Sequence, residues 1–136
     1  MHFKNERVEF ARINTENRDF RISTNHAPKS LRDSLDRLGL LNPPILLPKN
    51  DRFVIVSGFK RIEAARGLGW RKIPCKLFPL GESHRTCVRV AISENSQQRP
   101  LDIIETSRAL ALLKTCFDRD EISEEALRLG LPANLH

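Results

Sequence analysis

The sequence predicts a mixed α/β (α+β) fold, in which helices pack on a small mixed sheet. Two observations lead to this prediction: strand-like and helix-like patterns alternate along the chain, and no internal repeat or low-complexity segment interrupts them. The length of 136 residues suits one compact domain, and the hydrophobic share of 40% is enough for its core. No apolar run approaches the roughly 20 residues that a membrane helix needs, so we expect no membrane partner.

The first part of the chain is expected to contain a strand, a polar loop and a helix. The strand is predicted over Val8 to Ile13, where apolar and polar residues alternate, and the loop over residues 14–28. Leucines at helical spacing follow Ser30, which can cap the helix, and Gly39 stands where a left-handed helix stop is wanted. The leucine stripe is interpreted as core packing.

The middle of the chain is predicted to form a hairpin that runs through a glycine into a helix. Residues 43–47 and 53–56 are its strands, and residues 49–51 form the turn between them. The second strand ends at Ser57-Gly58, and the pattern becomes helical from Phe59 to Leu68. The expected order is therefore strand, glycine, helix.

The last part of the chain is expected to be mainly helical. A strand over residues 73–78 is followed by predicted helices over residues 83–94 and 101–117, and Pro100 favours the first turn of the second. A short final helix is predicted over residues 123–129, ending before Gly130.

The charge balance indicates an anionic partner. The chain carries 23 Lys and Arg against 17 Asp and Glu, a formal net charge of +6. This balance favours nucleic acid, nucleotide or an anionic membrane surface. The cations are interleaved with turns, which suits a pocket better than a basic tail. With 6% aromatic residues and no Tyr, the chain has few side chains for a platform of stacked bases.

The cysteines and the start of the chain exclude several classes of protein. Cys75, Cys87 and Cys116 are widely spaced without a CxxC pair, so neither a zinc site nor a disulfide framework is expected. We interpret them as small buried residues. The sequence starts Met-His-Phe-Lys, without the apolar stretch of a secretory signal, so a cytoplasmic location is expected.

The strand–glycine–helix turn is a candidate anion site. The first amide N–H groups of a helix lack intrahelical partners, and the helix dipole is positive at that end. Gly58 lets the backbone approach a ligand, and Lys60 and Arg61 add two charged donors within the first turn. Cations are electrostatically unfavourable there unless an anion offsets them. A phosphate is the expected ligand.

The polar segment 93–99 is a candidate metal and phosphate site. Mg²⁺ prefers oxygen ligands and usually takes one or two from protein, completing its shell with phosphates and water. Glu94 and Asn95 place a carboxylate and an amide oxygen side by side and would suffice. The alternative is an ordinary polar connector between two helices.

Three segments, in order, resemble the N-terminal domain of the ParB chromosome-partitioning family. Residues 39–45 (GLLNPPI) resemble its GLLQPI-type segment, which surrounds the nucleoside. Residues 57–65 (SGFKRIEAA) resemble its GERR-x-RAA phosphate segment. Residues 94–105 (ENSQQRPLDIIE) resemble its ENxQR-x-x-L-x-x-IE segment, whose Glu and Asn contact phosphate and the divalent ion. The resemblance implies nucleotide or phosphate contacts at Gly39, Asn42, Pro43, Gly58, Phe59, Lys60, Arg61, Glu94 and Asn95, with Glu94 and Asn95 also binding the metal.

The resemblance also implies a function. ParB proteins bind CTP with Mg²⁺, hydrolyse it slowly, and use it as a switch that closes a dimeric clamp on DNA. Residues 1–99 then correspond to a ParB/sulfiredoxin-like nucleotide-binding domain, and residues 100–136 to a helical segment leading into a truncated helix-turn-helix. DNA is expected to be read by the complete protein, a homodimer on the nucleoid. Arg18, Arg21 and Arg85 are candidate DNA or phosphate contacts.

The segments also depart from the family pattern. Phe59 stands where the family usually has Glu, Lys60 replaces its first Arg, and Asn42 replaces Gln. A lysine keeps the charge but lacks the planar fork that grips phosphate bidentately. Base selection and slow CTP hydrolysis are therefore open questions, and no catalytic residue is assigned.

Two alternative functions stay open at this point. One is a DNA-binding adaptor without nucleotide use, in which Lys60, Arg61 and Arg85 touch backbone phosphates and affinity falls steeply with salt. The other is a ParB-fold small-molecule kinase, with Glu94 or Glu63 as the base. Sulfiredoxin chemistry fits badly, because it requires a Cys in the phosphate turn and residues 57–61 contain none.

Overall fold

The computed structural model describes residues 2–24, 26–40 and 42–131. These residues divide into two compact units, one from residues 2–19, 26–40 and 42–82 and the other from residues 20–24 and 83–131. The first, here called unit 1, contains a sheet and two helices; the second, unit 2, is helical. No helix in the described ranges has the length and apolar character needed to cross a membrane.

Unit 1 is built on a five-stranded mixed sheet in the order β1-β5-β3-β4-β2. β1 and β5 are antiparallel, as are β3 and β4, whereas β5 with β3 and β4 with β2 are parallel. The strands are β1 (Lys4–Glu9), β2 (Ile13–Asn14), β3 (Ile45–Lys49), β4 (Arg52–Ser57) and β5 (Lys72–Leu77). The predicted fold class is confirmed.

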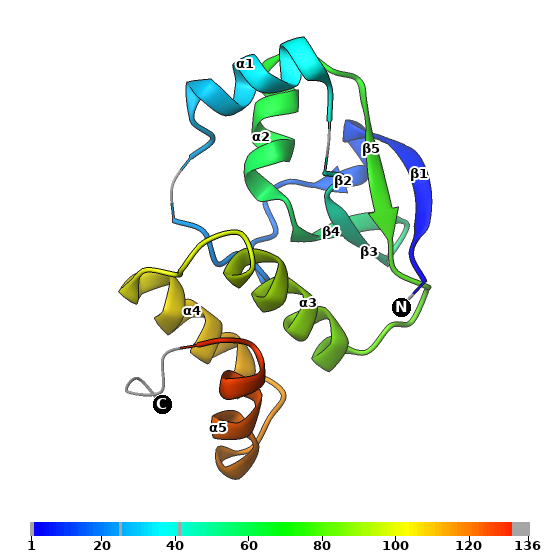
Figure 1. Ribbon diagram of the computed structural model, residues 1–136. Coiled ribbons are helices and arrows are strands. Elements are labelled where there is room, and N and C mark those ends of the chain that lie inside the picture. The colour runs from blue at the N-terminus through cyan, green and yellow to red at the C-terminus, as the bar shows by residue number, and fades with distance from the viewer. Residues whose placement is uncertain (1, 25, 41, 132–136) are drawn as a thin grey trace. The chain divides into compact units, whose positions relative to one another are not determined.

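Two helices of unit 1, α1 (Lys29–Leu38) and α2 (Phe59–Gly67), pack on each other beside this sheet (Figure 1). Strand and helix residues share one apolar core, in which Val8, Ile55 and Ile73 of the sheet meet Leu35 of α1 and Ile62 of α2. Four core residues of α2, with the partly buried Leu68 just after it, explain why this helix forms against the sheet: Phe59, Ile62, Ala64 and Ala65.

The start of unit 1 differs from the sequence prediction. The strand expected over Val8 to Ile13 is split, because a short 3₁₀ helix, η1 (Phe10–Arg12), separates β1 from β2. β1 starts earlier, at Lys4, and pairs with β5 over its whole length. Its burial hardly alternates, since only Val8 is buried, so the pattern did not reveal it. Ser30 is not the cap of α1; Pro28 occupies that position in an extended conformation.

Unit 2 contains α3 (His84–Ser96), α4 (Ile103–Lys114) and α5 (Arg119–Arg128). Side-chain caps define all three starts: Ser83 caps α3, and capping boxes begin α4 at Asp102 and α5 at Asp118. The capping boxes correct two predictions. Pro100 lies outside α4, and the final helix begins at Arg119, before the predicted residue 123.

A short segment from the first part of the sequence also belongs to unit 2. Residues 20–24 cluster with the helices, and Phe20 and Ile22 are buried. The Arg108 guanidinium donates a hydrogen bond of 3.1 Å to the Ser23 carbonyl, and the Phe20 ring lies 5.4 Å from the His84 ring. The chain therefore enters unit 2, returns to unit 1 and enters unit 2 again at residue 83.

Ion pairs connect the helices of unit 2. Arg89 of α3 donates two hydrogen bonds to the Glu125 carboxylate of α5, at 3.1 and 2.5 Å. The guanidinium groups of Arg85 and Arg89 lie 4.7 and 5.1 Å from the Phe117 ring centroid. Arg89 lowers the pKa of Glu125 below its ordinary value of 4.5, chiefly through these hydrogen bonds.

This pair predicts a pH-dependent term in stability. Because the folded-state pKa of Glu125 is depressed, its contribution is present above about pH 4.5 and is lost as the pH falls through the folded pKa. We expect Arg89→Ala to lower the free energy of unfolding by about 1–2 kcal/mol at pH 7, and the gap to the native chain to shrink below pH 4. Urea unfolding across this range measures it. A gap that stays constant with pH would contradict the prediction.

Candidate functional site

The turn between β4 and α2 is a position that only glycine fits. Gly58 has φ +95° and ψ 26°, in the left-handed region, and caps α2. A Cβ atom there would lie 2.8 Å from the Cβ and 2.9 Å from the Cα of Pro44. Ile45 pairs with Ser57 across the β3–β4 ladder. The structure therefore brings together two of the predicted motif segments, residues 39–45 and residues 57–61.

The first turn of α2 offers cations at this position. Lys60 is half-buried, and its ammonium makes no hydrogen bond or ion pair to another residue in the described part of the chain. Arg61 is half-buried as well, and it already has an interaction within the protein. The Phe59 side chain is in the core with 7% exposure, so only the backbone of Phe59 could meet a ligand. Lys60 is thus the cation in this turn with the most freedom to bind an anion.

The predicted nucleoside segment lies next to this turn. Gly39 caps the end of α1 with φ +74°, and its amide N–H donates to the Leu35 carbonyl at 2.9 Å. Asn42 is exposed and Pro43 is half-buried. Leu41, between Leu40 and Asn42 in this segment, lies outside the described residues.

Glu63, one of the two bases nominated for a kinase, has a structural partner. Its carboxylate accepts a hydrogen bond of 3.1 Å from the Ala27 amide N–H, and it lies 3.7 Å from Nδ1 of His26. These contacts fix the loop that precedes α1 onto α2. The arrangement favours a structural role for Glu63.

Glu94 and Asn95 lie in unit 2, near the end of α3, and both are half-buried. The Asn95 amide donates a hydrogen bond of 2.7 Å to the Ala91 carbonyl, which leaves its Oδ1 as an acceptor. Within the described ranges, the Glu94 carboxylate has no hydrogen-bond or ion-pair partner. The described residues contain no cluster of three or more His, Cys, Asp or Glu side chains suited to a metal. The donor set therefore fits Mg²⁺ only if phosphate and water complete its shell.

The three arginines nominated for DNA or phosphate differ in their environment. Arg18 is exposed on unit 1. In unit 2, Nε of Arg21 donates to the Ser23 carbonyl at 3.0 Å. Nε of Arg85 donates to the Cys116 carbonyl at 2.9 Å, and its Nη2 lies 3.4 Å from Glu121. Arg85 thus has a structural role between helices. Arg18 and Arg85 are both exposed, whereas Arg21 is half-buried.

The cysteines are as expected for packing residues. Cys75 and Cys87 are buried, Cys116 is half-buried, and none of the three is in a disulfide within the described residues. Burial raises the pKa of Cys75 to about 12, so its thiol stays protonated at neutral pH. None of them lies in the turn at residues 57–61.

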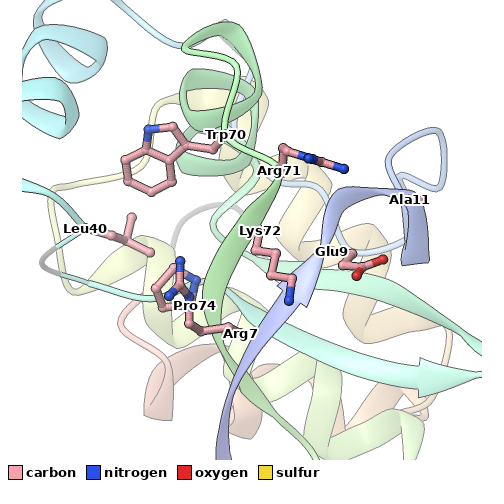
Figure 2. A pocket seen from close by; sticks show the side chains of 8 residues that line it. All are labelled: Arg7, Glu9, Ala11, Leu40, Trp70, Arg71, Lys72 and Pro74. Atoms are coloured by element: carbon pink, nitrogen blue, oxygen red, sulfur yellow. The ribbon is translucent and has the colours of Figure 1, made fainter.

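The structure also contains a pocket that the sequence analysis did not identify. It has a volume of about 950 Å³ and lies in unit 1, beside the first half of β5 (Figure 2). Arg7, Glu9, Ala11, Leu40, Trp70, Arg71, Lys72 and Pro74 line it. The basic pair Arg71-Lys72 beside Trp70 was the available signal in the sequence. The Trp70 side chain packs partly against the core and also faces this pocket.

Comparison with known families decides the classification. The sequence profile of the ParB N-terminal domain matches residues 4–96. The chain belongs to the ParB N-terminal domain family. Among curated ParB relatives, the chromosome-partitioning protein Spo0J of Thermus thermophilus is 31% identical over 96 residues, 70% of this chain and 35% of the relative. The nucleoid occlusion protein of Bacillus thuringiensis is 33% identical over 95 residues, 68% of this chain and 31% of the relative. The chain spans about a third of their length.

Solved structures agree with the ParB fold. A C-terminally truncated ParB from Caulobacter crescentus, complexed with CTP-γ-S, matches with a TM-score of 0.60 at 21% identity, over 96% of this chain and 73% of that one. The same protein complexed to the centromeric parS site gives 0.58 at 20% identity, over 95% and 66%. Sulfiredoxin from Arabidopsis thaliana gives 0.50 at 24% identity, over 62% and 97%. The predicted ParB/sulfiredoxin-like fold is confirmed.

Proposed function

We propose that this chain is the nucleotide-binding part of a DNA-binding partition or regulatory protein, with CTP as its ligand. The observation that carries the proposal is the turn at Gly58, where a left-handed glycine lies against Pro44 and begins a helix. The first turn of that helix carries Lys60, whose ammonium has no hydrogen-bond or ion-pair partner in the described part of the chain. Membership of the ParB N-terminal domain family and the likeness to a ParB structure that holds CTP-γ-S support the choice of ligand.

The residues have separate roles in this proposal. Gly58, Lys60 and Arg61 bind the phosphates, with the backbone of Phe59, and Gly39, Asn42 and Pro43 surround the nucleoside. Glu94 and Asn95 are the proposed Mg²⁺ ligands: their side-chain oxygens would bind the ion, and phosphate and water would complete its shell. The metal would neutralise phosphate charge when bound, while the protein side chains orient the ligand.

Membership of the family supports a wider role as well. We propose that nucleotide acts as a switch for a DNA clamp formed by a homodimer of the complete protein, which would place it on the nucleoid in the cytoplasm. The likeness to a ParB structure complexed to parS supports DNA as the partner. Slow hydrolysis of CTP would belong to the same cycle, and it is worth measuring once binding is established.

The test is calorimetric titration of the native chain with CTP, ATP, GTP and UTP, with and without Mg²⁺. We expect selective binding of CTP that weakens when Mg²⁺ is removed. Lys60→Ala and Arg61→Ala should each weaken binding by roughly 10- to 100-fold, since each removes a charge-assisted hydrogen bond of about 1.5–3 kcal/mol. Glu94→Gln should reduce the dependence on Mg²⁺.

Arg66→Ala is the matched control, because Arg66 lies in the last turn of the same helix and donates to Thr15 Oγ1 at 3.1 Å. It should change affinity less than about twofold. If no nucleotide binds, the pocket is degenerate and the DNA-adaptor function becomes the stronger one. A salt titration against duplex DNA would then show a steep fall in affinity that Lys60→Ala reduces.

A further inference from the structure

The pocket beside β5 lies at the opposite end of α2 from Gly58. The Trp70 amide donates to the Ala65 carbonyl at 3.1 Å, just beyond the last turn of α2, whereas Gly58 caps its first turn. Nine helical residues span about 13 Å. The pocket is therefore separate from the proposed phosphate turn.

Strand alternation explains which side chains reach this pocket. Val8 of β1 and Ile73 of β5 belong to the core shared with α1 and α2. Successive side chains of a strand point to opposite faces, so Arg7, Glu9 and Lys72 point away from that core. Figure 2 shows Lys72 and Glu9 extending from neighbouring strands. The pocket thus lies on the outer face of the β1–β5 pair.

The sheet is only two strands wide at this position. β3 pairs with β5 at Ile45↔Lys76 and Leu46↔Leu77, whereas β1 pairs with β5 from Lys72 to Leu77. In the described ladders, the first half of β5 has a strand neighbour on one side alone. The Lys76 N–H donates to the Pro44 carbonyl at 2.8 Å and Pro74 has no N–H, so a ligand here would be held by side chains more than by the β5 backbone.

Three cationic side chains around the pocket have no partner within the described residues. Arg7, Arg71 and Lys72 are exposed, and no side-chain hydrogen bond or ion pair engages them in the described part of the chain. Glu9 is the Cα partner of Lys72 across the ladder, yet the two side chains form no ion pair. Three cations against one carboxylate give the lining a charge of +2, so it complements an acidic ligand.

The remaining lining is apolar and partly fixed. Leu40 and Trp70 pack with one side against the core, and Pro74 and Ala11 contribute further apolar surface. In Figure 2, Trp70 and Leu40 lie near each other on one side of the pocket. A volume of about 950 Å³ is at the upper end of the range for ligand pockets. The pocket can hold an aliphatic or aromatic side chain.

We propose that this pocket binds an extended acidic segment of a partner protein. One apolar side chain of the segment would pack on Leu40 and Trp70, and its carboxylates would pair with Arg7, Arg71 and Lys72. Glu9 would accept hydrogen bonds from peptide N–H groups. A nucleic-acid backbone has no such N–H donors for the Glu9 carboxylate, so a peptide fits better than a phosphodiester. This proposal does not depend on nucleotide binding.

Trp70 supplies a direct readout, because the chain has one Trp and no Tyr. The probes are short acetylated and amidated peptides in which Glu and Asp surround one central Leu or Phe. We expect a saturable change in Trp70 fluorescence with a Kd below about 1 mM, weakened by salt. Arg7→Glu and Lys72→Glu should each weaken binding about 10-fold or more.

Controls make the outcome decisive. Lys49→Glu reverses an exposed charge at the C-terminal end of β3. Lys60→Ala removes the side chain proposed to bind phosphate. Both variants should leave the Kd for the acidic peptides unchanged. Peptides with a central Gly should bind more weakly. The proposal is overturned if no acidic peptide changes Trp70 fluorescence up to about 1 mM, if Lys- and Arg-rich peptides bind equally well, or if a single-stranded oligonucleotide binds more tightly than the peptides.

Discussion

Arg99→Ala is expected to lower the free energy of unfolding by about 3 kcal/mol. The Arg99 guanidinium donates two hydrogen bonds to the Glu105 carboxylate, at 2.7 and 2.6 Å, and Glu105 is 0% exposed. Removing the Arg99 guanidinium leaves the buried Glu105 carboxylate without its counter-ion. Breaking such a pair costs about 3–5 kcal/mol, and the lower end applies because the Arg99 side chain is 46% exposed. Urea unfolding followed by circular dichroism measures the loss.

Two further variants identify the cause. Arg128→Ala removes an ion pair of 2.6 Å to Glu124, in which the side chains are 65% and 66% exposed, and a longer contact of 4.0 Å to Glu125. Glu125 keeps its two hydrogen bonds from Arg89, so the loss should cost about 0.5 kcal/mol or less. Adding Glu105→Gln to Arg99→Ala removes the buried charge and keeps a side chain able to complete the capping box, so part of the stability should return. If Arg99→Ala costs no more than Arg128→Ala, the buried pair does not stabilise the fold.

Gly58→Ala is expected to destabilise the chain by about 3 kcal/mol, from backbone strain and overpacking together. The new Cβ would meet the backbone and ring of Pro44 at 2.8–3.2 Å, and φ is +95°. Relief requires the turn and the 39–45 segment to move apart. Since both are proposed to hold the nucleotide, CTP affinity should fall by more than about 10-fold, an effect of over about 1.4 kcal/mol. Thermal unfolding and calorimetry measure the two effects.

Gly69→Ala separates the clash from the backbone conformation. Gly69 has φ +81°, but nothing lies within 4 Å of its added Cβ. This variant should cost about 1 kcal/mol and leave CTP affinity unchanged. Equal losses for the two variants would mean that contact with Pro44 contributes nothing.

Much of unit 1 was predictable because its signals are local. The hairpin of β3 and β4 and the passage through Gly58 into α2 follow from apolar runs bounded by turn residues, and the structure has them in this order. The sequence prediction began the first strand at Val8, whereas β1 begins at Lys4, and there is a physical reason for this error. β1 lies at the edge of the sheet with one buried residue, and its position is set by pairing with β5, which is far along the chain.

The candidate site divides in the same way. Gly58 and Pro44 are 14 positions apart in the sequence, and their close approach could be recognised only in the folded structure. The segments that contain them had each been predicted as part of the site. The hydrogen bonds from the Ala27 N–H to Glu63 and from Arg99 to Glu105 also depend on which residues the fold brings together. The pocket at Trp70 combines residues from β1, β5 and the segment before β3, so no stretch of sequence contains it. The nucleotide contacts themselves stay a prediction.

The excursion of residues 20–24 into unit 2 restricts how this protein can be recombined. Phe20 and Ile22 are 4% and 1% exposed, so a gene fusion that transplants residues 83–136 alone would omit two interior side chains of the unit it intends to move. Conversely, a truncation after residue 82 would retain those two apolar residues without the helices they belong to. A single genetic crossover near residue 82 would therefore separate residues 20–24 from the helices with which they cluster. We expect unit 1 and unit 2 to be inherited together.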